Sequence, residues 1–242
     1  MGTLINAGLI ILGGAIGLLF KKAISENMEY SIHKATGISV LVIGLAGVIS
    51  NMISVGEDGR LSSSGELMLV VSLALGTFIG EILKLDEKLD KGCKKIESKF
   101  KMSNFSSGFI TASMIFCIGA MAIVGSINDG LLHDSSTLVT KGIIDGITSV
   151  VLAASLGWGV LVSAVPILIY QGAMTLLASS LQGVLKGELL TNICIVGYAL
   201  VMCIGINFLY NSKKQIKTVN MIPSLLVPVI YALGKYVVTL IK

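Results

Sequence analysis

Two charged residues stand inside an apolar stretch of the chain, and their spacing makes them the first candidates for chemistry. Asp145 lies in Ile-Ile-Asp-Gly, and Lys141 precedes it within the apolar run 138–157. On an α-helix this i,i+4 spacing places both side chains on one face, where they can form an ion pair, although Lys before Asp is the weaker order. A charge near the centre of a bilayer costs on the order of 3 kcal/mol, so such a residue usually faces the protein interior and marks an ion or proton path.

The pair has two interpretations. Asp145 is the central charge of a path and Lys141 its partner or competitor, or the two residues neutralise one another and only fix the packing of their helix. We expect Ser135 or Ser136 to cap this helix. Asp145 then lies about nine residues into it, or about 14 Å along the axis, near the midplane of a bilayer.

Asp129 is the second candidate acid. It follows Asn128 in Ile-Asn-Asp-Gly and closes the apolar run 108–128. On a straight helix it lies near the membrane boundary, where an ordinary Asp-Gly turn explains it about as well as a site does. A break in the run at Gly119 or Gly125 would instead bring Asp129 inward. Both alternatives stay open, and Asn128 and Asp129 are candidates for lining the path.

Three further polar residues lie in apolar runs. Asn6 is in the first turns of one run, and Gln171 follows Pro166 in another, where a distorted helix would free a backbone carbonyl. Such groups can bind a cation or a polar substrate, although an interhelical hydrogen bond is the commoner role of a lone Asn or Gln in a membrane. Glu81 stands near Lys84 at the end of a run, which suits an interfacial acid or, alternatively, a gate.

The elements that position these residues are membrane spans. The chain is 54% hydrophobic and 13% charged, with a mean hydropathy of +0.89, whereas charged residues make up about a quarter of a soluble domain. A hydrocarbon core about 30 Å thick needs about 20 apolar residues per helix. This count predicts an all-α polytopic transmembrane bundle of about eight spans: 3–20, 35–55, 66–83, 108–128, 138–157, 159–181, 190–210 and 220–241. The fifth and sixth are nearly continuous, and a single crossing over 138–181 would reduce the count to about seven.

The placement of basic residues predicts the orientation. Three alternate loops carry most of the lysines, among them Lys21, Lys22, Lys34, Lys84, Lys88, Lys91, Lys94, Lys95, Lys99, Lys101, Lys213, Lys214 and Lys217. Short cytoplasmic loops collect Lys and Arg. We therefore expect a multi-pass protein of the plasma membrane with both termini outside. Between the third and fourth spans, residues 84–101 have apolar positions at helical spacing, which predicts a cytoplasmic amphipathic helix that rests on anionic lipid or, alternatively, docks a partner.

Weak self-similarity relates the two ends of the chain. The segment from Thr36 lies over the segment from Val196, and the segment from Ser72 lies over that from Ile230. This pattern predicts one membrane domain, 1–242, with a first three-span unit at 1–83, a central helical hairpin at 108–157 and a second three-span unit at 159–242. Because two spans separate the units, the second would be inverted, as in many secondary transporters. Apolar segments also match by chance, and the sequence leaves that alternative open.

Several strings in this order and spacing resemble one family: Gly2 to Gly8 (Gly-Thr-Leu-Ile-Asn-Ala-Gly), Gly80-Glu81, Phe116 to Ile123, Gly125 to Gly130 (Gly-Ser-Ile-Asn-Asp-Gly) and Leu168 to Gly172 (Leu-Ile-Tyr-Gln-Gly). Over nearly its whole length the chain resembles the domain-of-unknown-function 554 family of bacterial integral membrane proteins. The resemblance implies an inner-membrane protein, often described as a transporter, and carries no substrate.

Together these observations predict a secondary transporter or channel for a small ion or solute, with Na⁺ or H⁺ as the coupling cation. The alternative is a non-transporting scaffold or sensor that acts through the basic helix 84–101. Gly13 and Gly17 have the GxxxG spacing, which predicts close helix packing within the chain or in a homodimer. We expect no enzyme, cofactor or metal centre, because His33 and His133 fall on opposite sides of the membrane in this arrangement and no His/Cys cluster has metal-ligand spacing. We expect no nucleic-acid partner, because no aromatic or basic cluster suggests one.

Overall fold

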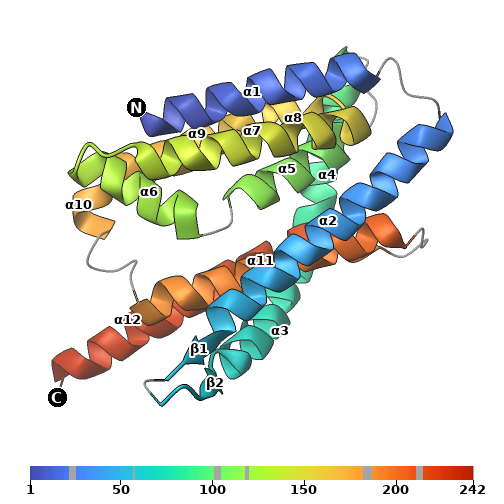
Figure 1. Ribbon diagram of the computed structural model, residues 1–242. Helices are drawn as coiled ribbons and strands as arrows, with labels where there is room; N and C mark the ends of the chain where they lie inside the picture. The colour runs from blue at the N-terminus through green and yellow to red at the C-terminus, as the bar shows by residue number, and fades with distance from the viewer. Residues whose placement is uncertain are drawn as a thin grey trace.

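A computed structural model of the chain describes residues 1–21, 26–56, 58–100, 105–117, 120–181, 187–210 and 215–241. These residues form an all-α helical bundle with one short antiparallel hairpin, as Figure 1 shows. Several of the helices are long and apolar enough to cross a membrane. The predicted fold class, a polytopic helical bundle, is therefore confirmed.

The helices pack in two layers, which lie one above the other in Figure 1. The first layer contains α1 (Gly2–Lys21), α5 (Phe105–Cys117), α6 (Ala120–Leu131), α7 (Ser136–Leu156), α8 (Gly159–Val162), α9 (Ala164–Leu176) and α10 (Ala178–Leu181). The second contains α2 (Glu26–Met52), α3 (Glu66–Leu83), α11 (Gly187–Leu209), the 3-10 helix η1 (Thr218–Leu225) and α12 (Leu226–Ile241). Each layer thus takes helices from both halves of the chain, and α4 (Leu85–Phe100) contacts both layers.

Glycines set the close approach of α1 and α7, which run parallel. A Cβ atom on Gly13 would lie 2.0 Å from the carbonyl oxygen of Gly146, and one on Gly17 would lie 2.3 Å from that of Val150. Both distances are far below van der Waals contact, so a residue with a Cβ would force the two backbones apart. The GxxxG spacing of Gly13 and Gly17 therefore serves packing within the chain.

The second layer is held by contacts of the same kind between antiparallel helices. On α2, a Cβ on Gly44 would lie 2.7 Å from the backbone nitrogen of Met202 on α11. On α3, a Cβ on Gly80 would lie 1.8 Å from the carbonyl oxygen of Asn220 on η1. The pair of α2 with α11 joins the segments from Thr36 and from Val196 that the weak sequence repeat relates to one another, whereas η1 precedes the repeat segment that begins at Ile230.

The chain reverses direction between α7 and α8. Gly157 has φ 81°, a left-handed conformation that favours glycine, and α8 begins two residues later. α9 then runs back along α1, because Gln171 contacts Asn6 while Leu161 lies against Gly14. The fifth and sixth predicted spans are therefore separate helices, and a single crossing over 138–181 does not fit the structure.

Fewer helices in the described part of the chain meet the length and hydropathy needed to cross a membrane than the eight spans that the sequence predicted. Among the described residues, six helical segments are long and apolar enough to cross a membrane, and α5 with α6 would make seven if this bent pair is one span. The second expected span, 35–55, is the one that falls short: it corresponds to α2, whose apolar part is only Gly37–Met52. Beyond α2 lies the hairpin of β1 (Ile53–Val55) and β2 (Leu61–Ser63), which the sequence did not predict.

The two ends of the bundle differ in character. Both chain termini lie at the same end in Figure 1, together with the β-hairpin. At the other end, the beginning of α2, the end of α11 and residues 215–219 surround a cavity that α4 also lines. The basic residues of these segments that the structure describes therefore gather at one end, which we call the α4 end. α4 has the expected helical structure, with an ion pair of 2.6 Å between Asp90 and Lys94, whereas Lys101 lies outside the described residues.

Candidate functional site

Lys141 and Asp145 form a buried ion pair on α7. The Lys141 Nζ donates a hydrogen bond to the Asp145 Oδ2, one helical turn away. Lys141 is 6% exposed and Asp145 is 5% exposed. Charges so well shielded from solvent interact strongly, and removing either one leaves the other without compensation.

Two amide side chains from neighbouring helices join the pair. Asn6 on α1 and Gln171 on α9 are both fully buried, and the Asn6 Nδ2 donates to the Gln171 Oε1 at 3.2 Å. The Asn6 side chain also lies close enough to Asp145 to interact with it. The structure thus brings together four of the residues expected to line a path. The close contact of Asn6 with Gly142 explains the arrangement, since a Cβ on Gly142 would lie 2.9 Å from the Asn6 Cα.

Several buried polar atoms on the three helices of this cluster have no hydrogen-bond partner. In the described part of the chain, eight buried side-chain nitrogen or oxygen atoms have no hydrogen-bond partner. Five of the eight belong to α1, α7 and α9: Thr3 Oγ1, Asn6 Oδ1, Ser149 Oγ, Gln171 Nε2 and Thr175 Oγ1. Each unsatisfied buried group costs about 1–3 kcal/mol, and native proteins keep few of them. Their concentration where three helices meet suits the binding of a small polar species. Sequence reasoning missed the hydroxyl groups, because Ser and Thr are common in apolar helices.

Asp129 is buried as well, at 5% exposure near the end of α6. Its Oδ2 accepts hydrogen bonds from the Gly2 backbone nitrogen at 3.2 Å and from the Met1 amino group at 3.0 Å. A carboxylate at this position stabilises the positive end of the α1 dipole. Asp129 lies about one turn of α1, roughly 6 Å, from the level of Asn6. Asp129 therefore has an inward position, as the broken-helix alternative requires, together with a structural role.

The helix that carries Asp129 is broken. α5 and α6 differ in direction by 61° across residues 118–119, which lie outside the described residues. Cys117, the last residue of α5, lies close enough to Lys141 and Asp145 to interact with both electrostatically. Helix breaks at membrane depth expose backbone groups and occur where these groups line a site. The break therefore adds to the case for a site beside the ion pair.

The two remaining candidates lie apart from the cluster. Asn128 is partly buried on α6, and its backbone carbonyl accepts hydrogen bonds from the nitrogens of Leu132 at 2.8 Å and Asp134 at 3.4 Å. Glu81 is half exposed at the α4 end and pairs with Lys217 at 3.2 Å. Its ion-pair partner is Lys217, from the segment before η1.

The cap of α7 lies at Ser135, one of the two expected positions. Ser135 occupies the cap position, but its side chain makes no capping hydrogen bond. Asp134 serves instead, because its Oδ1 accepts from the Ser136 backbone nitrogen at 2.9 Å. Hydrogen bonds from Ser136 hold the pKa of Asp134 below its usual value. The expected depth of Asp145 in the helix is unaffected, because α7 begins at Ser136.

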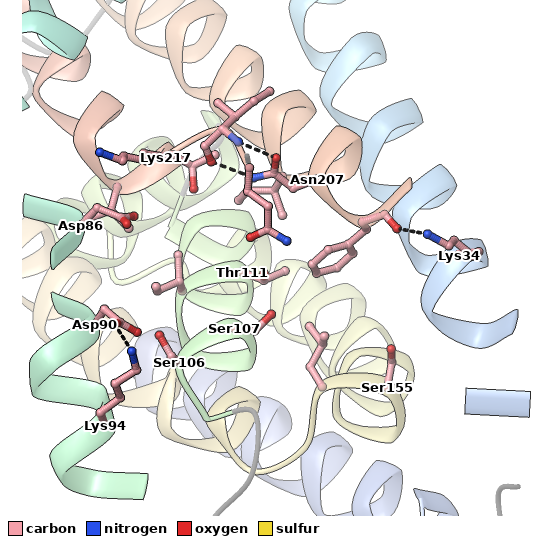
Figure 2. A pocket seen from close by; sticks show the side chains of 18 of the residues that line it. Lys34, Asp86, Asp90, Lys94, Ser106, Ser107, Thr111, Ser155, Asn207 and Lys217 are labelled. Carbon is pink, nitrogen blue, oxygen red and sulfur yellow. Dashed lines mark hydrogen bonds and ion pairs between the residues drawn. The ribbon is translucent and has the colours of Figure 1, made fainter. Parts of the chain in front are cut away.

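A cavity of about 710 Å³ opens at the α4 end between the two layers (Figure 2). Asp86 and Asp90 of α4 form one wall, Ser107 and Thr111 of α5 lie beneath, and Asn207 of α11 lies opposite. No motif signalled this cavity, because its lining comes from segments far apart in the sequence. Lys141 and Asp145 do not line it. Among the described residues, no group of three or more His, Cys, Asp or Glu side chains could hold a metal ion.

The helical bundle and its apolar spans define the class, a multi-pass membrane protein with buried charge between its helices. The chain belongs to the family described as "Protein of unknown function (DUF554)", whose model matches residues 1–233. It is 33% identical over 238 residues to the "Uncharacterized membrane protein YdfK" of Bacillus subtilis (strain 168), covering 96% of this chain and 98% of that protein. It is 27% identical over 233 residues to the "Uncharacterized protein YqgA" of Escherichia coli (strain K12), covering 93% of each. No solved structure matches the chain.

Proposed function

We propose that the protein is a membrane transporter for a small monovalent cation, with Asp145 as the binding carboxylate. The observation that carries the proposal is the buried Lys141–Asp145 pair on a helix that packs between buried amides, of which the Asn6 Oδ1 and the Gln171 Nε2 have no hydrogen-bond partner. A proton or a sodium ion suits this site, because a carboxylate binds the first directly and carboxylate and amide oxygens are ligands for the second. The family names carry no substrate, so the choice of cation rests on the site alone.

Lys141 acts as an internal competitor for the cation. A buried charge without its partner costs about 3–5 kcal/mol, so Asp145 needs a counter-charge in every state of a transport cycle. Lys141 supplies that charge in the empty site, and the transported cation replaces it in the loaded site, where Lys141 releases its own proton so that no buried ammonium is left unpaired. The Asn6 Oδ1, which accepts no hydrogen bond, then becomes a neutral oxygen ligand. Binding and release are thereby coupled to the movement of one lysine side chain.

A carrier fits these features better than a channel. The pair is almost completely buried, and Lys141 and Asp145 line neither the cavity at the α4 end nor the one that Thr191 and Tyr231 line near the start of α11. The broken α5–α6 helix beside the pair and the antiparallel pairing of α2 with α11 support an inverted repeat, which is the usual basis of alternating access. We place the basic α4 end in the cytoplasm, with both termini outside, in the bacterial plasma membrane.

The test is cation flux in liposomes that contain the purified protein. We expect an imposed Na⁺ or pH gradient to drive flux through the wild type, and Asp145→Asn to reduce flux to the level of protein-free liposomes. The matched control is Asp58→Asn, which removes an exposed acid from the β-hairpin turn and leaves flux unchanged. Transport is rejected if the wild type moves no ion or solute under any gradient. Asp145 is rejected as the binding carboxylate if its variant keeps full flux.

A second candidate function is a membrane scaffold or sensor that acts through α4. The observation in its favour is that α4 contacts both layers and presents Lys88, Lys91, Lys95 and Lys99 on exposed positions. A row of lysines at the cytoplasmic surface binds anionic lipid or an acidic partner. The same liposome assay separates the two functions, since a scaffold produces no flux with either form of Asp145.

A further inference from the structure

The Lys141–Asp145 pair and the cavity at the α4 end lie on one face of α7. Leu156 lines the cavity, about 16 Å along the helix from Asp145. Steps of about 100° per residue place Ser149, Leu152 and Leu156 within about 40° of Asp145 around the axis. A single strip of α7 surface therefore runs from the ion pair to the floor of the cavity.

This strip changes character along its length. Next to the pair lies Ser149, fully buried, whose Oγ has no hydrogen-bond partner in the described part of the chain. Below it lie Leu152 at 1% exposure and Leu156 at 2% exposure. Both leucines belong to the apolar core cluster that also contains Phe116. A thin apolar layer thus separates a polar, ligand-like environment from the cavity.

The charges that line the cavity nearly cancel one another. Each lysine on its wall is engaged: Lys94 pairs with Asp90 at 2.6 Å, Lys217 pairs with Glu81 at 3.2 Å, and Lys34 donates to the carbonyl oxygens of Phe208 and Leu209 at 2.9 Å. The Asp86 carboxylate faces the same space in Figure 2, above the hydroxyls of Ser107 and Thr111. Carboxylate and hydroxyl oxygens suit a hydrated cation.

We propose, resting on the transport function above, that this cavity is the vestibule through which the cation reaches Asp145. Leu152 and Leu156 form the barrier between the vestibule and the ion pair. The conformation described here has this barrier closed. An apolar constriction excludes water and hydrated ions without any charged gate, so opening requires only that the two leucines withdraw from the core.

Cysteine accessibility tests the vestibule without relying on transport. In a background with Cys93, Cys117, Cys194 and Cys203 replaced by Ser or Ala, single cysteines are introduced as Ser107→Cys, Ser149→Cys and Thr191→Cys. Ser107 lines the vestibule, whereas Thr191 lines a second cavity of about 630 Å³ near the other end of α11. The probe is a small, membrane-impermeant methanethiosulfonate cation, added to either side of oriented vesicles.

We expect Ser107→Cys to react from one side only, and Thr191→Cys from the opposite side. Ser149→Cys should react at least about tenfold more slowly than Ser107→Cys, because the apolar barrier keeps the hydrated reagent out. Adding Leu156→Ala should raise the reaction rate of Ser149→Cys by about tenfold, from the Ser107 side. If Leu156→Ala fails to fold, Leu152→Ala makes the same test, since Leu152 lies one turn deeper in the same barrier.

Ile195→Ala is the matched control, because Ile195 is a buried aliphatic residue at 1% exposure on α11, near Gly65 and away from this strip. It should leave the rate at Ser149→Cys unchanged. The proposal is overturned if Ser107→Cys reacts from neither side, if Ser149→Cys reacts as fast as Ser107→Cys with both leucines intact, or if neither leucine variant speeds its reaction. If the cysteines react as expected but the liposomes show no flux, the transport function is rejected and the accessible cavity stands. If flux is seen but the cysteines do not react as expected, the vestibule is rejected and the transport function stands.

Discussion

The buried ion pair makes a quantitative prediction about stability. Lys141 and Asp145 are only 6% and 5% exposed, so truncating one residue leaves the other charge almost completely shielded from water. Lys141→Met should therefore lower the free energy of unfolding by about 3–5 kcal/mol, and Asp145→Leu by a similar amount. The double variant removes both charges and both desolvation penalties, so its stability should lie within about 1 kcal/mol of the wild type.

Thermal unfolding in detergent measures these differences. A change of 1 kcal/mol shifts the Tm of a chain of this size by about 2–4 °C, so each single variant should lose roughly 6–20 °C while the double variant loses little. A double-mutant cycle then isolates the coupling between the two side chains. Losses that simply add in the double variant would refute the claim that the pair is buried and coupled. A stable double variant without flux would also separate the two interpretations of the pair, because a pair that only fixes packing is dispensable once its packing is replaced.

Two other predictions concern acids outside the pair. Asp129→Asn weakens the hydrogen bonds to Gly2 and Met1 at the start of α1. We expect the free energy of unfolding to fall by about 2 kcal/mol, which lowers the Tm while most of the flux is retained. An unchanged Tm with abolished flux would instead place Asp129 in the transport path. Burial raises the pKa of Asp86 above its ordinary value of 3.8. The folded state therefore binds the proton of Asp86 more tightly than the unfolded state does. The resulting stabilisation is present below about pH 3.8 and is lost as the pH rises through the folded-state pKa. Asp86→Asn should remove that slope from Tm measured between about pH 3.5 and 6, and a slope that persists would assign it to another group.

The sequence alone predicted the features that depend on local pattern. Long apolar runs gave the helices, and an acid and a base one turn apart inside such a run gave the ion pair, because a buried charge has few alternatives to a partner. The amphipathic pattern of residues 84–101 likewise predicted α4. Gly13 and Gly17 predicted a close helix contact, although their partner, α7, could not be named.

Features that depend on distant parts of the chain were not predictable. The contact between Asn6 and Gln171 joins residues far apart in the sequence, and neither residue carries a signal for the other. The cavity at the α4 end is assembled from six separated segments, each of which looks ordinary by itself. Asp129 illustrates the limit most clearly, since an Asp-Gly turn and a buried carboxylate have the same local sequence. Only the break between α5 and α6 and the position of α1 distinguish them.

The distribution of close glycine contacts indicates which parts of the molecule move together. Among the described residues, every pair in which a glycine Cβ would clash with another helix lies within one layer, as with Gly13 and Gly146 or Gly80 and Asn220. Helices locked by backbone contact cannot slide without losing that contact, whereas side-chain interfaces allow small shear and rocking movements. The contact between the layers is made by side chains of the apolar core, including Ile10 and Leu200.

The proposed site therefore lies within one layer, whereas the proposed vestibule lies between the two layers. Asn6, Lys141, Asp145 and Gln171 all belong to the first layer, so the site stays intact when the layers move. The cavity lies between the layers, with Thr111 on one side and Asn207 on the other. Its width, and the packing of Leu156 at its floor, depend on the angle between them. Rocking of one layer against the other would open or close access to an unchanged site, as alternating access requires, and α4, which contacts both layers, is the element placed to limit that movement.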